Sequence, residues 1–198
     1  MLFRSFYVLF YNFDYYFSSN WWKVIAVWEG GMSFHGGLVG IVAACYLFCK
    51  RKGIQLLQVA DVLAAPLMLA LAFGRISNFI NGELWGTPSD VSWCVVFSVD
   101  SLCRHPYQLY EALKRFAIFG WLVWLGRKVW GVGFVFWNFV LLEGLGRFFL
   151  DFFKDEPTAW VGQAFSVAMV LVAGWMLWNK HGEDWKKVFY TSKKDLKS

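Results

Sequence analysis

The sequence predicts an all-α fold, a polytopic integral membrane helix bundle with about five full spans and a partial N-terminal span. Hydrophobic residues make up 58% of the 198 residues, and aromatic residues make up 21%. One small soluble core could not bury that much apolar surface, so a membrane is the expected solvent. Backbone groups in lipid must bond to one another, and the apolar runs lack the two-residue period of barrel strands. We therefore expect helical spans in a single membrane domain over residues 1–198.

Five apolar runs approach the roughly 20 residues that a helix needs to cross a hydrocarbon layer about 30 Å thick. They cover residues 33–49, 56–74, 109–126, 131–153 and 162–178. Ahead of them, residues 1–13 provide half a crossing at most, and we expect them to be the remnant of a span. They lack the charged start, apolar middle and small-residue cleavage site of a signal peptide.

Lysine and arginine residues set the expected orientation of these spans. The loops and the tail on one side hold eleven of the nineteen basic residues, and they cover residues 50–55, 127–130 and 179–198. We expect that side to be cytoplasmic, so that the loop at 84–108 faces outward. Lys114 and Arg115, at the outer end of the third span, run against this rule. The basic tail is expected to anchor on anionic lipid headgroups rather than to bind nucleic acid.

Two arginines at the depth of the bilayer are the first candidates for function. Arg75 lies at the outer end of the second span, and Arg147 lies inside the fourth. A cation there costs about 2.5–3.5 kcal/mol on insertion scales, so an anionic partner is expected. Glu143 and Asp151 lie one helical turn on either side of Arg147, on the same helix face. Two interpretations stay open: a structural ion-pair ladder, or two outward-facing arginines that converge on a lipid phosphate.

Further candidate site residues are expected at the same outer side of the membrane. They are Asn78, Asn81, Gly82, Glu83 and Gly86 in the stretch FGRISNFINGELWG, and Arg104, His105, Tyr110 and Glu111 in the stretch RHPYQLYE. The second stretch alone is also compatible with a helix entry that begins at Pro106. His35, at the mouth of the first span, can act as a base near neutral pH, and a purely structural histidine is expected equally.

Together these stretches resemble the prolipoprotein diacylglyceryl transferases of bacteria, in that family's order and spacing. They are YVLFYN (7–12), GGMSFHGGLVG (30–40), GRISNFINGELWG (74–86), RHPYQLYE (104–111), and GRFFLDFF followed by DEP (146–157). The pattern GRxxNFxNGExxG with an upstream HGG is highly specific, and the resemblance covers nearly the whole chain. It implies a multi-pass transferase of the bacterial cytoplasmic membrane, with its active site toward the outer leaflet and a cytoplasmic C-terminus.

The implied reaction moves the diacylglyceryl group of phosphatidylglycerol to the lipobox cysteine thiol of a preprolipoprotein signal peptide and releases glycerol phosphate. A thiol is mostly protonated at pH 7, so a base must take its proton; His35 is the first candidate and His105 the second. Arg75 and Arg147 would bind the departing phosphate, more tightly in the transition state. The expected partners are these two substrates and membrane lipids, without nucleic acid, cofactor or metal. The sequence has no His/Cys cluster at metal-ligand spacing.

The resemblance also implies roles for the neighbouring residues. Asn78, Asn81 and Glu83 would hold the headgroup hydroxyls or brace Arg75. Gly86 would leave room for the substrate. The implied substrate-binding set comprises Asn78, Asn81, Gly82, Glu83, Gly86, Arg104, Tyr110, Glu111, Glu143 and Asp151.

The chain departs from the family at three positions of these stretches. Asp151 stands where glutamate is common, Glu143 where tyrosine is common, and Tyr107 where serine is usual. The shorter aspartate is expected to reach less well toward Arg147, so we expect Glu143 to compensate from one turn earlier. Arg147 would then lie in a clamp of two carboxylates.

A further departure concerns the N-terminus. Family members usually begin well before YVLFYN, with one complete span and most of another, including a tyrosine of the site. That part is missing from this sequence, and if the chain is truly this short, we expect a poorly stabilised helix bundle with weak or absent activity. A misplaced start codon, a gene fragment and a truly reduced protein stay open as explanations.

The cysteines are not candidates for the nucleophile, because the reactive thiol belongs to the substrate. Cys45 and Cys49 lie one turn apart on a span and are expected to pack as small residues. Cys94 and Cys103 share the outward loop, where an oxidising compartment would let them pair. The sequence alone gives no distance, so the pairing stays open.

Two other classes of function compete with the transferase. A small transporter or channel would use intramembrane charges as an ion path, but it would be expected to show broken helices in paired repeats, which the sequence lacks. A non-catalytic lipid-binding or scaffold protein stays open, because a shortened chain could keep the site without its activity.

Overall fold

The computed structural model describes residues 34–98, 101–155 and 159–195, and the expected span remnant at residues 1–13 lies outside them. The chain divides into two compact units, residues 1–59 and 60–198, which are described separately here. The described residues are mostly helical. The elements are α3 (Phe34–Lys52), α4 (Leu56–Ile80), β1 (Val95–Val96), β2 (Cys103–Arg104), α5 (Tyr107–Gly126), α6 (Phe134–Leu150), the 3-10 helix η3 (Asp151–Phe153) and α7 (Ala159–Asp195).

Each predicted apolar run overlaps one α-helix of the structure. α4 continues past residue 74 to Ile80, so that Arg75 and Asn78 lie in its last turns. Among the described residues, two helical segments are long and apolar enough to cross a membrane, Leu56–Ile80 and Gly162–Val188. The predicted tail at 179–198 begins as helix, because α7 runs on to Asp195.

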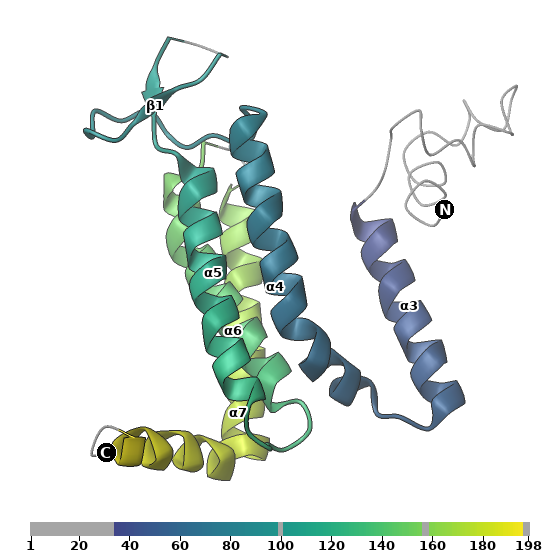
Figure 1. Cartoon of the computed structure of the whole chain (residues 1–198). Coiled ribbons are helices and arrows are strands. Elements are labelled where there is room, and N and C mark those ends of the chain that lie inside the picture. Colours follow the sequence, from purple (N-terminus) through teal and green to yellow (C-terminus); the bar gives the residue numbers. More distant parts are fainter. Residues whose placement is uncertain (1–33, 99–100, 156–158, 196–198) are drawn as a thin grey trace, which may run out of the picture. The chain divides into compact units, whose positions relative to one another are not determined.

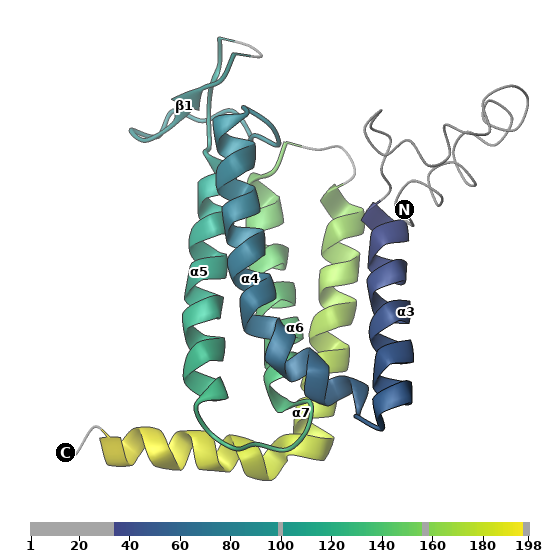
Figure 2. The same ribbon diagram turned by 45° about the vertical axis from the view of Figure 1, so that its right-hand side comes forward.

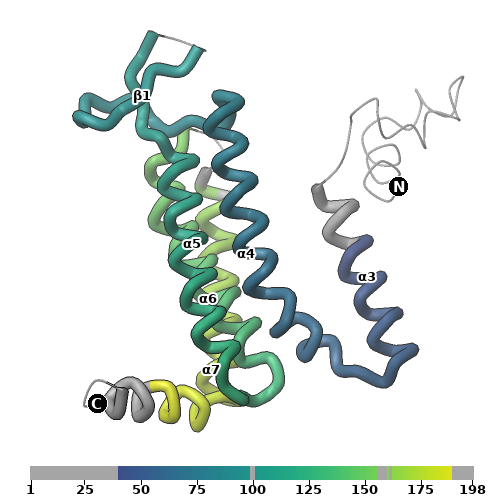
Figure 3. The backbone as a smooth tube through the Cα atoms, viewed as in Figure 1, coloured from purple at the N-terminus to yellow at the C-terminus, as the bar shows by residue number. Residues whose placement is uncertain are grey.

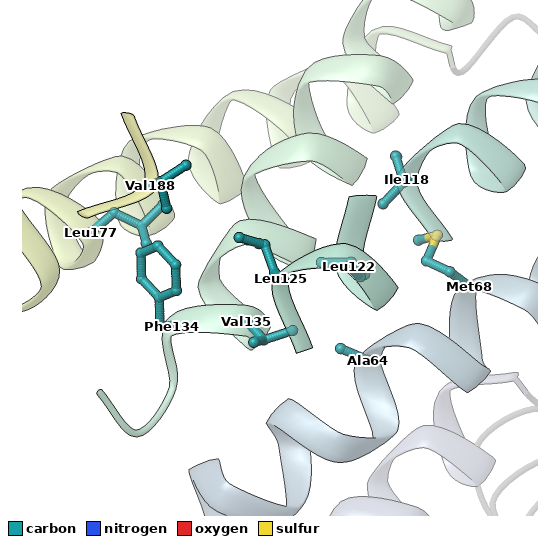
Figure 4. Close-up of a cluster of buried hydrophobic side chains, with 9 residues drawn as sticks. All are labelled: Ala64, Met68, Ile118, Leu122, Leu125, Phe134, Val135, Leu177 and Val188. Carbon is teal, nitrogen blue, oxygen red and sulfur yellow. The ribbon is translucent and has the colours of Figure 1, made fainter. Parts of the chain in front are cut away.

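In the second unit, α4, α5, α6 and the first part of α7 stand side by side (Figures 1 and 2). Their apolar core lies toward the end of the bundle opposite β1, where Leu125 and Phe134 are fully buried. Figure 4 shows side chains of four helices that meet in this core, namely Ala64, Met68, Ile118, Leu122, Leu125, Phe134, Val135, Leu177 and Val188. A Cβ at Gly144 would lie 3.1 Å from the Ser166 carbonyl oxygen. Small residues of this kind let α6 and α7 pack closely, as helices in lipid do.

Two aspartates fix the connection between α5 and α6 at that end. The Asp61 carboxylate of α4 accepts hydrogen bonds from the backbone N–H groups of Gly133 (2.6 Å) and Phe136 (2.7 Å), which caps the start of α6. Asp184 accepts another from the Gly131 N–H (3.2 Å). α7 is kinked at His181, and beyond the kink it crosses the ends of α5 and α6 (Figures 1 and 3).

The connection between α4 and α5 forms the opposite end of the second unit. It carries the antiparallel hairpin of β1 and β2, in which Val95 pairs with Arg104. A disulfide joins Cys94 to Cys103, with 5.4 Å between the Cα atoms, which answers the question of pairing that the sequence left open. Cys45 and Cys49 are free thiols of α3. The hairpin end of the bundle holds the functional candidates of this unit.

Candidate functional site

Arg75 of α4 and Arg147 of α6 each have a buried carboxylate behind them. The Arg75 Nε lies 3.6 Å from Glu111 Oε2, and the Arg147 Nε lies 3.4 Å from Asp151 Oδ2. The side chains of Glu111 and Asp151 are 1% and 3% exposed, whereas those of Arg75 and Arg147 are 21% and 47% exposed. Each carboxylate can therefore orient a guanidinium group whose remaining N–H donors are available to an anion.

One face of α5 connects the two arginine sites. Tyr107 and Glu111 lie one turn apart on this helix, and both are buried. The Tyr107 hydroxyl donates a hydrogen bond to Asp151 Oδ1 (2.9 Å), while Glu111 pairs with Arg75. The first turns of α5 thus brace both arginines. Convergence of the two guanidinium groups on one phosphate stays a prediction.

The prediction that Glu143 and Asp151 form a two-carboxylate clamp around Arg147 is wrong. Asp151 does reach Arg147 despite its shorter side chain, because the two residues lie one turn apart where α6 passes into η3. Glu143 instead contacts α5, with its Oε1 2.9 Å from Arg115 Nη2 and its Oε2 3.1 Å from Lys114 Nζ. Two buried cations on the neighbouring helix hold this carboxylate more strongly than one half-exposed arginine on its own helix could.

Hydrogen bonds hold the predicted site residues Asn78 and Glu83 in place at the end of α4. The Asn78 side-chain amide donates to Glu83 Oε2 (3.0 Å), and Gln108 of α5 donates to the Glu83 carbonyl oxygen (2.6 Å). Gly82 has a φ of +67°, the left-handed conformation that glycine adopts readily at a helix end. Asn81 beside it is exposed. Asn78 and Glu83 therefore brace each other in this state of the protein, and their contact with a headgroup stays a prediction.

The residues of RHPYQLYE divide between the loop and the helix. The Arg104 guanidinium donates to the Gly86 carbonyl oxygen (3.2 Å), pairs with Asp155 and lies over the Trp85 ring. It is almost fully buried, so it ties the hairpin to the segment after η3. In the same loop, the His105 Nδ1 lies 3.1 Å from the Tyr110 hydroxyl oxygen.

The Tyr110 hydroxyl has a second partner, the indole N–H of Trp93, which donates to it at 2.7 Å. The His105 ring also packs edge-on against Phe153. The His105 ring is thus held in place by Tyr110 of α5 and by Phe153 of η3. Its role as the second candidate for the base remains a prediction.

His35 lies in the first turn of α3, in the unit of residues 1–59. Its side chain lies outside the described set, so its predicted role as the base stays a prediction. Among the described residues, no group of three or more His, Cys, Asp and Glu side chains is placed to hold a metal ion.

Gly86 has a packing role that the sequence did not predict. A Cβ at this position would lie 2.7 Å from the carbonyl oxygens of both His105 and Phe153. The Gly86 N–H also donates to the His105 carbonyl oxygen (3.1 Å). This close backbone approach, rather than room for a substrate, accounts for the glycine.

Replacing Gly86 with alanine is expected to destabilise the protein by about 1–3 kcal/mol, because the backbone at His105 and Phe153 would have to move away from the added methyl group. Gly120→Ala is the matched control: a Cβ there meets nothing within 4 Å, and alanine favours the helix. Thermal unfolding in detergent would measure both. Equal unfolding temperatures for the two variants would contradict the packing role.

Three charged or polar residues of the site escaped the sequence interpretation. Lys114 and Arg115 were noted only as exceptions to the orientation rule, and Tyr107 only as a departure from the family. Their spacing did hold a signal, because Lys114 and Arg115 follow Glu111 by three and four residues on a helix. The partner helix α6 could not be identified from that spacing.

Comparison with known proteins shows which family the chain resembles in sequence. The sequence pattern of the prolipoprotein diacylglyceryl transferase family matches residues 3–179. A relative from Brucella anthropi, a phosphatidylglycerol–prolipoprotein diacylglyceryl transferase, is 45% identical over 187 residues, which cover 87% of this chain and 66% of the relative. A relative of the same name from Idiomarina loihiensis is 48% identical over 158 residues, which cover 79% of this chain and 59% of the relative.

The match therefore includes every described element of the site, from α4 to the first part of α7. The chain spans less than two thirds of the length of each of these relatives. With 45–48% identity and a family match over most of its residues, the chain belongs to the prolipoprotein diacylglyceryl transferase family.

Proposed function

We propose that this chain transfers the diacylglyceryl group of phosphatidylglycerol to the lipobox cysteine of prolipoproteins and releases glycerol phosphate. The observation that carries the proposal is the pair of partly exposed arginines, each with a buried carboxylate behind it. An anionic phospholipid head fits such a site better than a neutral one, because guanidinium groups bind phosphate oxygens through paired N–H donors. The names of the relatives support the choice of phosphatidylglycerol and prolipoprotein as substrates.

At the glyceryl carbon, the reaction forms one bond and breaks one. The cysteine sulfur attacks the glyceryl carbon that bears the phosphate ester, so that a carbon–sulfur bond forms while the carbon–oxygen bond to the phosphate breaks. The thiol proton passes to a base, for which His35 and His105 are the candidates. The phosphate gains charge as it leaves, so Arg75 and Arg147 would hold it more tightly in the transition state than in the bound lipid.

We also propose five membrane spans, α3 to α7, with the hairpin end toward the outer leaflet of the bacterial cytoplasmic membrane. The distribution of lysine and arginine supports this orientation, since the connections at the other end are basic. Lys114 and Arg115 at the hairpin end are neutralised by Glu111 and Glu143 within the bundle. They are not free to interact with headgroups and therefore do not count against the orientation.

A transfer assay tests the function. The full chain would be placed in vesicles that contain phosphatidylglycerol, together with a lipobox peptide. The expected result is a peptide mass increased by one diacylglyceryl group and an equal amount of released glycerol phosphate. A peptide with serine in place of cysteine is the control and should stay unmodified. Lipid binding without transfer would contradict the proposal and favour a non-catalytic lipid-binding protein.

A further inference from the structure

Five ionisable side chains from three helices form a buried charge cluster behind the exposed part of Arg75. Glu111 of α5 is its centre: Arg115 Nη2 lies 2.6 Å and Arg75 Nε 3.6 Å from its Oε2, and Lys114 Nζ lies 2.8 Å from its Oε1. Glu143 of α6 contacts Lys114 and Arg115 from the other side. Apart from Arg75, each of these side chains is at most 12% exposed. The charge cluster is therefore Arg75, Glu111, Lys114, Arg115 and Glu143.

The charge cluster holds three cations and two carboxylates, so its formal net charge is +1. Lys114 and Arg115 are nearer to Glu111 than Arg75 is, and each of them also meets Glu143. These four groups balance one another. The excess positive charge consequently belongs to Arg75, the member of the cluster with the most exposed side chain.

We propose that Lys114, Arg115 and Glu143 are positioning residues that preserve the positive charge of Arg75 for an anionic phosphate headgroup. This inference rests on the proposed function, whose substrate carries such a headgroup. Without the two neighbouring cations, the Glu111 carboxylate would pair with Arg75 alone and cancel its attraction for an anion. Within a low-dielectric bundle these charges act strongly on one another. A change of one unit in the net charge behind Arg75 therefore alters the attraction of its exposed side for an anion.

The two single neutralisations change the net charge of the cluster in opposite directions, and the double one leaves it unchanged. Lys114→Met lowers it to zero and keeps most of the length of the side chain, while Glu143→Gln raises it to +2 and keeps the shape. The double variant K114M/E143Q returns it to +1. A purely structural ion-pair cluster predicts that both single variants lose stability and function alike, since each leaves a buried charge without its partner. Charge control of Arg75 predicts effects of opposite sign.

Two measurements on the full chain in vesicles show whether the two single variants change anion binding in opposite directions. The first is the KM for phosphatidylglycerol: we expect it to rise about tenfold in K114M, to stay level or fall in E143Q, and to return to the wild-type value in the double variant. The second is the rise in unfolding temperature on addition of glycerol phosphate, which should be smallest in K114M and largest in E143Q. The exposed pair Glu183 and Lys186 on α7 supplies the control, with E183Q/K186M expected to change neither.

Equal anion responses in all three variants, or shifts of the same sign in K114M and E143Q, would overturn the inference. If K114M does not fold, E143Q and K114M/E143Q still differ by the Lys114 charge alone, and the double variant must bind the anion more weakly than E143Q. A chain that shows the expected order with glycerol phosphate but transfers no diacylglyceryl group would uphold the inference and refute the proposed function.

Discussion

Replacing Arg75 or Arg147 with glutamine is expected to lower the rate of diacylglyceryl transfer by about 10²–10³-fold, the usual effect of removing one donor that faces developing charge. Glutamine keeps two N–H donors but loses the positive charge. Because the phosphate gains charge as the carbon–oxygen bond breaks, kcat should fall more than KM rises. The measurement is the initial rate of peptide modification at several phosphatidylglycerol concentrations.

Lysine variants and a distant arginine sharpen this test. Lysine keeps the charge without the planar donor pair, so R75K and R147K should recover part of the lost rate. Arg127, exposed at the other end of α5, is the matched control, and R127Q should retain wild-type activity. A transfer rate within threefold of wild type in R75Q or R147Q would exclude that arginine from the phosphate site.

The helices of the second unit were predictable from local sequence. A helix long enough to cross a membrane needs a continuous apolar run whatever its neighbours are, and the runs at 56–74, 109–126, 131–153 and 162–178 each overlap one α-helix of the structure. The bounds were less predictable at α4, whose last turns carry Arg75 and Asn78 rather than apolar residues. The kink at His181 was not predicted; its ring packs beside Phe134 of α6, a contact between helices that the local sequence does not reveal.

The candidate site was predictable in its residues but not in its contacts. Intramembrane charge drew attention to Arg75 and Arg147, and the structure places a buried carboxylate on each. Spacing along one helix suggested Glu143 as a partner of Arg147. In the structure the Glu143 carboxylate instead contacts Lys114 and Arg115 of α5, because a side chain on a helix face can pair with residues of a neighbouring helix as well as with those of its own helix. Only the relative placement of α5 and α6 decides between them.

Two departures from the family are explained by one contact. Where the resemblance implies serine and glutamate, this chain has Tyr107 and Asp151. The tyrosine hydroxyl reaches from α5 to Asp151 Oδ1, while Oδ2 of the same carboxylate faces Arg147. The tyrosine side chain is longer than serine and the aspartate is shorter than glutamate, so the two still meet, and the Asp151 carboxylate stays oriented toward Arg147. A substitution at either position alone would leave the other buried group without this hydrogen bond.

Replacing Glu111 with leucine is expected to have the largest effect on stability of any single change in the second unit. Its carboxylate lies against Arg75, Lys114 and Arg115, so its loss leaves three cations with Glu143 as their one remaining carboxylate in the charge cluster. Removing one partner of a buried charge pair costs about 3–5 kcal/mol, even though a well-packed apolar cluster in its place could be stable.

The loss should appear in denaturant unfolding of the full chain in detergent micelles as a fall of about 3–5 kcal/mol in the free energy of unfolding. Glu183→Leu is the matched control, because Glu183 is exposed and its pairing with Lys186 is worth at most about 1 kcal/mol. Glu111→Asp should fall between the two, since it keeps the charge but moves it away from the cations. If E111L unfolds at the same denaturant concentration as E183L, the carboxylate does not hold the helices together, and the bracing of Arg75 by α5 would have to be abandoned with it.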